Sequence, residues 1–163
     1  MNIVLLEPEI AGNTGNIGRT CCATGTSLHL IEPLGFRLND KEIRRAGMDY
    51  WEKLDLHRYC DYEDFMEQKG PGRIWYATTK AHRMYTQVEF APEDYIMFGP
   101  ESAGIPEEIL AKNERSCIRI PMGYDIRSLN LSNSAAIILY EALRQQDFAG
   151  LEEKGELHRL SFE

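Results

Sequence analysis

Short apolar segments, several of which end at glycine or proline, alternate with helical segments along most of the chain. The first of them, Asn2–Leu6 (NIVLL), is apolar without interruption, as is typical of strands covered on both faces. We expect strands at Asn2–Leu6, Ser27–Glu32, Leu54–His57, Arg73–Thr78, Glu93–Phe98 and Cys117–Ile120, and helices between Glu9 and Gly25, at Asn39–Gly47, Asp61–Gln68 and Pro106–Asn113, and from Leu131 onward. This alternation predicts an α/β fold with a mainly parallel sheet and helices on both of its faces.

Length and composition narrow the class of protein. The 163 residues suit a single domain, which we expect to span residues 1–150 and to be followed by a polar tail at 151–163. No apolar stretch approaches the roughly 18 residues of a membrane span, and the amino-terminal segment lacks the features of a secretory signal. The four cysteines have no C-x-x-C spacing, so we expect free thiols in a cytoplasmic protein. Four histidines with no paired ligand spacing give no indication of a metal site.

The charge is unevenly distributed. A formal net charge of −8 argues against a general nucleic-acid binder, because contacts to phosphate dominate the affinity of such proteins. The acidic residues, however, concentrate in Asp61–Glu67 and in the carboxy-terminal tail. The remaining surface is therefore less acidic than the total suggests, and a local basic patch is compatible with the composition.

The segment Ile118–Leu143 (IRIPMGYDIRSLNLSNSAAIILYEAL) is predicted to be a strand end, a loop and a long helix. Pro121 cannot donate to a sheet, so it ends the strand. One helical face is apolar and consists of Leu131, Ala135, Ile138, Leu139 and Ala142. A helix start needs one capping Ser or Asn, yet five such residues lie within Ser128–Ser134. We interpret the surplus as a polar wall of a pocket between the strand end and the helix.

Three predicted strand ends carry loops rich in small residues, at Ala77–Lys80 (ATTK), Gly99–Glu101 (GPE) and Ile120–Gly123 (IPMG). In open α/β sheets, ligands bind beyond the carboxyl ends of the strands. Glycine and proline leave backbone groups accessible, and such groups suit the edge of an adenine base. Together with the polar helix start, these loops favour a nucleoside-type pocket.

The first helix contains an unusual glycine pattern. Gly15 and Gly18 each cost about 1 kcal/mol relative to alanine in a helix, so we expect close approach by another helix, a ligand or a second subunit. Gly12, Gly15 and Gly18 also suggest a dinucleotide-binding turn, with Glu32 as the ribose ligand. The spacing is G-x-x-G-x-x-G rather than G-x-G-x-x-G, so a nicotinamide-dependent oxidoreductase is the weaker interpretation.

Three motifs together resemble a known family. EPEIAGNTGNIGRT, MFGPESAGIP and IRIPMGYDIRSLNLSNSAAIILYEA, in that order, resemble the SPOUT methyltransferases, most closely the small tRNA (cytidine/uridine-34)-2′-O-methyltransferases. The resemblance covers Met1 to about Phe148 and departs from the pattern only at Ser102-Ala103. It implies a deep trefoil knot in the carboxy-terminal part, bound S-adenosylmethionine, and a homodimer whose active site uses both subunits.

The resemblance also implies the reaction, which is 2′-O-methylation of the wobble nucleotide (position 34, cytidine or carboxymethylaminomethyluridine) in the anticodon loop of tRNA-Leu isoacceptors. Alternatives are a noncatalytic RNA-binding module with a knotted fold and an enzyme that methylates another RNA ribose. An arginine loses its proton only above about pH 12. We therefore expect Arg19 to donate hydrogen bonds to the developing alkoxide or to a phosphate rather than to act as a base.

The residues that we expect at the functional site fall into three groups, of which the basic RNA-binding group, apart from Arg19, rests on its closeness to a predicted cofactor loop rather than on the resemblance. The expected catalytic residues are Arg19, Asn13, Ser128 and Asn130; the expected cofactor-binding residues are Ala77, Gly99, Glu101, Ile120, Met122 and Ser128; and the expected RNA-binding residues are Arg19, Lys80, Arg83 and Arg44. His82 and Arg45 extend the predicted basic patch. Tyr124 and Tyr140 are candidates for stacking on the wobble base, although we expect Tyr140 to lie in the core.

Overall fold

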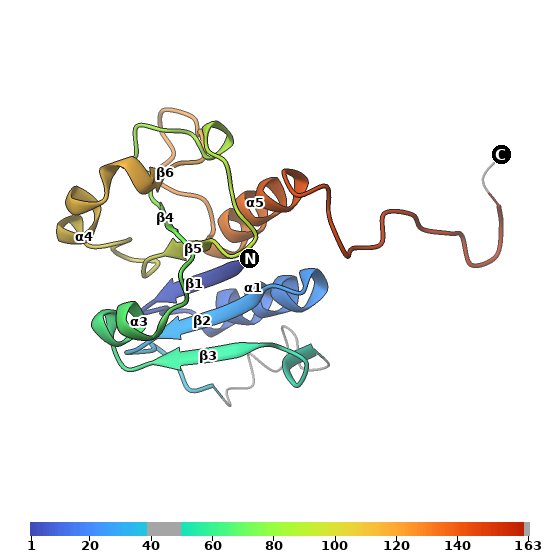
Figure 1. Ribbon diagram of the computed structural model, residues 1–163, viewed down its shortest axis with the longest axis horizontal. Coiled ribbons are helices and arrows are strands. Elements are labelled where there is room, and N and C mark those ends of the chain that lie inside the picture. The colour runs from blue at the N-terminus through green and yellow to red at the C-terminus, as the bar shows by residue number, and fades with distance from the viewer. Residues whose placement is uncertain (39–49, 162–163) are drawn as a thin grey trace.

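The computed structural model describes residues 1–38 and 50–161 and contains one six-stranded sheet (Figure 1). The strands are β1 (Asn2–Leu6), β2 (Ser27–Ile31), β3 (Leu56–Tyr59), β4 (Ile74–Ala77), β5 (Tyr95–Phe98) and β6 (Cys117–Ile118). Their order is β3-β2-β1-β5-β4-β6, and every ladder between them is parallel. The predicted α/β fold with a parallel sheet is therefore confirmed.

Helices cover both faces of the sheet, as predicted. They are α1 (Ala11–Thr24), α3 (Tyr62–Gln68), α4 (Glu107–Lys112) and α5 (Leu131–Arg144), with short 3-10 turns η1 (Tyr85–Gln87) and η2 (Glu114–Ser116). On β1, Ile3 and Leu5 join the buried cluster that contains residues of α1 and α5. Val4 and Leu6 point to the other face and join the cluster with Phe65 of α3 and Leu110 of α4. The predicted helix at Asn39–Gly47 lies outside the described residues.

The end of α1, the close packing at Gly18 and the start of α3 agree with the sequence interpretation. Helix α1 ends at Gly25, whose φ of +62° is the left-handed conformation that glycine adopts readily. The close approach expected at Gly18 is made by two side chains, since a Cβ there would lie 3.0 Å from Trp51 and 3.3 Å from Leu54. Asp61 caps α3 by accepting a hydrogen bond from the Asp64 amide.

Strand β6 is shorter than predicted, ending at Ile118 rather than Ile120. The reason is a change of partner. The Arg119 amide donates to the Arg83 carbonyl, and the Tyr85 amide donates to the Arg119 carbonyl. The chain therefore leaves the sheet at Arg119 to pair with the segment before η1.

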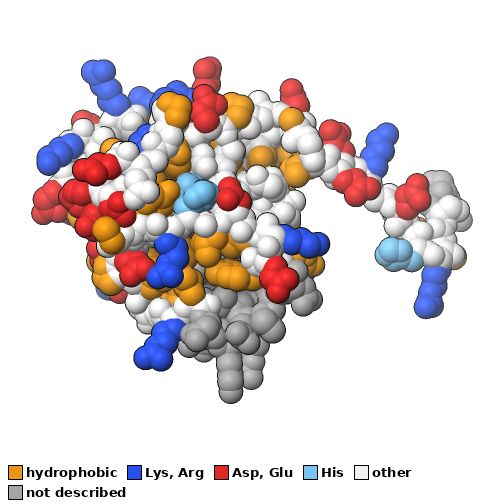
Figure 2. Space-filling view, turned by 60° about the horizontal axis from the view of Figure 1, so that its bottom comes forward, with side chains coloured by type: hydrophobic (Ala, Val, Ile, Leu, Met, Phe, Trp, Pro, Cys, Tyr) orange, Lys and Arg blue, Asp and Glu red, His pale blue; other side chains and the backbone are white. Residues whose placement is uncertain are grey.

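One group of acidic side chains lies on α3 and α4. In Figure 2 this group is on the left flank, where Figure 1 places the two helices, and further acidic side chains lie along the segment after α5, which runs away from the body. The first turns of these two helices carry Glu63, Asp64, Glu107 and Glu108. Among residues 1–38 and 50–161, no helix has the length and apolar character that a membrane crossing requires.

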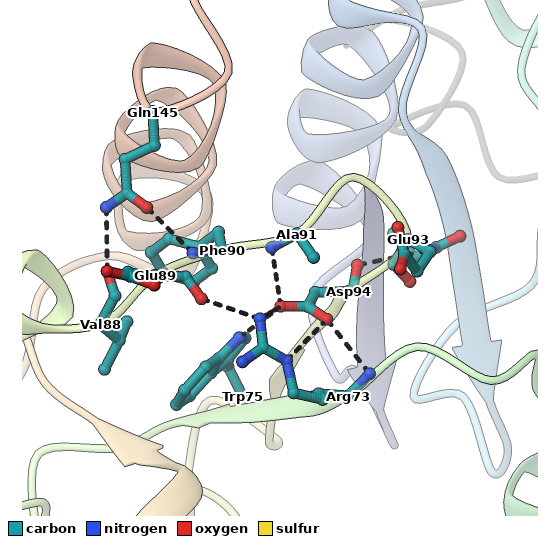
Figure 3. Close-up of polar contacts among 10 residues, drawn as sticks. Arg73, Trp75, Val88, Glu89, Phe90, Ala91, Glu93, Asp94 and Gln145 are labelled. Atoms are coloured by element: carbon teal, nitrogen blue, oxygen red, sulfur yellow. Dashed lines mark hydrogen bonds and ion pairs between the residues drawn. The ribbon is translucent and has the colours of Figure 1, made fainter.

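A buried carboxylate organises the amino ends of β4 and β5 (Figure 3). Asp94, 1% exposed, accepts hydrogen bonds from the Arg73 guanidinium (2.8 Å), the Trp75 indole (2.9 Å) and the Ala91 amide (3.0 Å). Gln145 of α5 ties the same region to the helix by bonding the Phe90 amide and the Val88 carbonyl, as Figure 3 also shows. Burial alone raises the pKa of Asp94, but the donors from Arg73, Ala91 and Trp75 lower it below its ordinary value overall.

We expect Asp94→Asn to lower the free energy of unfolding by about 2–4 kcal/mol at pH 7, because it leaves buried donors without an ionised acceptor. A carboxyl whose folded pKa is depressed stabilises the protein above its ordinary pKa of about 4, and this contribution is lost as the pH falls through that value toward the folded pKa. Urea unfolding between pH 7 and about pH 2 measures the effect, with Glu67→Gln at an exposed position of α3 as the control. Equal losses in both variants would contradict this role for Asp94.

Candidate active site

A cavity of about 610 Å³ opens at the carboxyl ends of β1, β5, β4 and β6. Because these strands are parallel neighbours, the loops that follow them meet at one edge of the sheet. Its walls come from 77–80 after β4, 98–105 around the end of β5, and 118–131 between β6 and α5, together with Ile10 and Asn13 at the start of α1. The three loops singled out in the sequence therefore share one hollow.

Most of the expected site residues line this cavity. They are Asn13, Ala77, Lys80, Gly99, Glu101, Ile120, Met122, Ser128 and Asn130. Arg19 and Arg83 do not line it, and Arg44 lies outside the described residues. The structure thus brings together the residues assigned to the cofactor and leaves Arg19 and Arg83 outside the cavity.

A chain of hydrogen bonds joins three of the cavity walls. The side-chain nitrogen of Asn13, which is buried on α1, donates to Glu101 Oε1 at 3.0 Å, and the side-chain oxygen of Asn13 accepts from Asn130 Nδ2 at 3.0 Å. Asn130 is also the cap of α5, because its oxygen accepts from the amides of Ser132 (2.9 Å) and Asn133 (3.3 Å). The two asparagines expected to be catalytic therefore also hold the starts of α1 and α5 together.

A second set of contacts was not foreseen from the sequence. The Glu9 amide donates to Glu101 Oε2 at 2.8 Å, and Glu9 in turn accepts from the Ser102 amide (2.8 Å) and hydroxyl (2.7 Å). The hydrogen bonds from Ser102 lower the pKa of the Glu9 carboxyl. Glu9 stands inside the first motif, EPEIAGNTGNIGRT, which was the only sign in the sequence that could have singled it out.

Backbone packs against backbone at Gly99. A Cβ at this position would lie 2.2 Å from the Gly104 carbonyl carbon and 2.3 Å from the Ile105 nitrogen. The turn is closed by a hydrogen bond of 2.8 Å from the Gly104 amide to the Pro100 carbonyl, and Gly104 has a φ of +72°. The glycine at 99 is therefore required by the shape of the wall.

The basic residues near the cavity differ in their surroundings. Lys80 pairs with Glu107 of α4 at 2.7 Å, and this contact lowers the pKa of Glu107. Arg83 donates to the Arg115 carbonyl at 3.2 Å. Arg127, which the sequence interpretation did not select, lines the cavity and makes no hydrogen bond or ion pair with another described residue.

Arg19 lies away from the cavity of its own chain. It follows Asn13 by six positions on α1, which places it about 240° round the helix axis and about 9 Å along it. Its side chain is exposed, with the guanidinium 5.3 Å from the centre of the Tyr50 ring. Tyr124 is fully exposed near the cavity, whereas the expectation that Tyr140 lies in the core is wrong, since it is 47% exposed on α5.

The structure does not support a dinucleotide-binding turn. Gly12, Gly15 and Gly18 all lie inside helix α1 and form no loop between β1 and the helix. Within residues 1–38 and 50–161, no three His, Cys, Asp or Glu side chains are grouped in a way that could hold a metal ion.

Comparison with known proteins identifies the class. The SpoU rRNA Methylase family matches residues 1–140, and the chain belongs to this family. Its sheet and helices have the SPOUT fold by structural match: the AdoMet-bound rRNA methyltransferase from Sinorhizobium meliloti superposes with a TM-score of 0.78 at 28% identity, over 88% of this chain and 55% of that one.

Within the family, the tRNA (cytidine(34)-2′-O)-methyltransferases are much more similar. Those of Escherichia coli K12 and Saccharophagus degradans are each 49% identical, over 151 and 150 residues; the matches cover 92% and 91% of this chain and 96% and 97% of the relatives. A solved structure that concerns 2-OH methylation of C/U34 on tRNA has 40% identity and a TM-score of 0.86, over 90% of this chain and 95% of that chain.

Proposed function

We propose that this protein transfers a methyl group from S-adenosylmethionine to the ribose 2′-hydroxyl of nucleotide 34 in tRNA. The observation that carries the proposal is the 49% identity, over nearly the full length of both chains, to enzymes named for this reaction. The cavity supports it, because all three motifs of the sequence contribute to its walls. Residues 1–150 form the catalytic domain in this proposal, and the tail at 151–163 lies outside it.

The cavity has the size and chemistry that this cofactor requires. Its volume of about 610 Å³ lies within the roughly 300–1,000 Å³ typical of small-molecule sites. Ala77, Ile120 and Met122 supply apolar parts of the wall, while Ser128 and Asn130 supply polar groups. When bound, S-adenosylmethionine supplies the methyl group that is transferred.

The chain's own residues have positioning and electrostatic roles in this proposal. Asn13, Glu101 and Asn130 fix the relative positions of the walls by the hydrogen bonds described above. Alignment of two bound reactants supplies roughly 7–11 kcal/mol of barrier lowering, so errors in wall position reduce the rate strongly.

Arg19 acts, in our proposal, on the cavity of a second copy of the chain. An exposed guanidinium that does not line its own cavity has to meet its substrate elsewhere. In a homodimer it would reach the ribose or an adjacent phosphate bound at the partner's site and donate two hydrogen bonds. Arg127 and Lys80 at the cavity mouth are then the contacts for the phosphates of the anticodon loop.

Incubation with S-adenosylmethionine labelled on the methyl group and bulk tRNA, followed by mass spectrometry of nuclease fragments, tests the proposal. We expect label on the 2′-oxygen of nucleotide 34. Binding of tRNA without transfer would favour a noncatalytic RNA-binding module, and label on another nucleotide would identify a different RNA 2′-O-methyltransferase. Tight binding of NAD with none of S-adenosylmethionine would favour an oxidoreductase.

A further inference from the structure

Two carboxylates hold the loop after β1 and the loop after β5 together through a reciprocal set of hydrogen bonds. Glu101 accepts from the backbone amide of Glu9, and Glu9 accepts from the backbone amide and hydroxyl of Ser102. The bonded residues are 92 and 93 positions apart in the chain. We call Glu9, Glu101 and Ser102 the loop latch. Because two of its donors are backbone amides, the latch fixes the position of the loops themselves.

The latch determines where one wall of the cavity stands. Glu101 and Ser102 belong to the tight turn between Gly99 and Gly104, which lines the cavity. The second oxygen of Glu101 accepts from Asn13 and so extends the connection to the start of α1. Glu9 itself does not line the cavity, and its contacts with the turn are made outside it.

We propose that Glu9 is a positioning residue for the cofactor cavity, acting through the Ser102 amide and hydroxyl. Without the Glu9 carboxylate, the turn from Gly99 to Gly104 loses the two hydrogen bonds from Ser102. It then stays attached only through Glu101, which accepts from the Glu9 amide and from Asn13. The turn then samples positions in which the cavity is too wide for its ligand. This inference rests on the proposed function, because the ligand is taken to be S-adenosylmethionine.

The variants Glu9→Ala and Glu9→Gln test the proposal, with Glu67→Ala on exposed α3 as the matched control. We expect Glu9→Ala to raise the Kd for S-adenosylmethionine, measured by calorimetry, and its KM about 5- to 10-fold, as expected for lost hydrogen bonds to a charged group. The kcat at saturating cofactor should change less than about twofold, because no group at the reacting atoms is removed. Hydrogen exchange at the Ser102 amide should become faster.

Glu9→Gln should restore most of the affinity, since its amide oxygen accepts from the Ser102 amide and its NH2 group donates to the Ser102 hydroxyl. Ser102→Ala should weaken binding in the wild-type background and have no further effect in Glu9→Ala, because the hydroxyl has then already lost its partner. A Glu9→Ala protein with wild-type affinity and unchanged exchange at Ser102 would overturn the inference. A wild-type protein that fails to bind S-adenosylmethionine would instead overturn the proposed function.

Discussion

Replacing Arg19 with alanine is expected to lower the rate of methyl transfer by about 10²–10³-fold, the loss typical of removing a donor that stabilises developing charge. Affinity for S-adenosylmethionine should stay within about twofold, because the Arg19 side chain does not line the cavity of its own chain. Single-turnover rates and calorimetry measure the two quantities. Arg159→Ala, in the tail, serves as the control for removing a surface arginine. A parallel loss of cofactor binding would contradict this role for Arg19.

Replacing Gly99 with alanine is expected to weaken binding of S-adenosylmethionine by about 10- to 100-fold. The added Cβ would lie 2.2 Å and 2.3 Å from backbone atoms of Gly104 and Ile105, so the turn has to open, with a cost similar to that of overpacking a core. Gly123→Ala is the matched control, since a Cβ there meets nothing within 4 Å. Calorimetry measures the affinity, and urea unfolding shows whether the variant is folded. Equal affinity in both variants would show that the turn does not shape the site.

Mixing these two impaired variants, at a cofactor concentration near the wild-type Kd, tests whether the active site is shared. If Arg19 serves the partner's cavity, a mixed dimer contains one site with an intact cavity and an intact arginine. Random exchange makes half of the dimers mixed, each with one of two sites complete, so about a quarter of the wild-type activity should return. If Arg19 serves its own cavity, the mixed dimer still has no complete site, and the mixture is no more active than the two variants alone.

The sequence predicted the elements of the fold better than their arrangement. Strand β1 matches its predicted bounds, and α5 begins at Leu131 with Ala135, Ile138, Leu139 and Ala142 buried. Local patterns determine both: an unbroken apolar run for the strand and helical periodicity for α5. The order β3-β2-β1-β5-β4-β6 depends on pairing between distant segments, which no local pattern encodes. The trefoil knot implied by the resemblance stays a prediction about how the chain threads.

The candidate site shows the same contrast between features that a local pattern predicts and contacts that depend on distant segments. Small residues at strand ends were visible in the sequence, and the parallel sheet brings those ends together. The role of Glu9 was not visible, because its partner Ser102 lies 93 positions away and nothing local in a carboxylate indicates such a contact. The surplus of Ser and Asn around the start of α5 has the predicted role, since Asn130 caps the helix while Ser128, Asn130 and Ser134 line the cavity.

The hydrogen bond between Asn13 and Asn130 spans 117 positions and so constrains the order of events during synthesis. Strands β1, β2 and β3 can pair as soon as the first 59 residues have left the ribosome. The central position beside β1 stays open until β5 emerges, and the last wall of the cavity arrives only with α5. A nascent chain therefore exposes an unpaired edge of β1 for much of its translation, and a chain released before α5 lacks the part of the cavity wall formed by Leu131, Ser134 and Ile138.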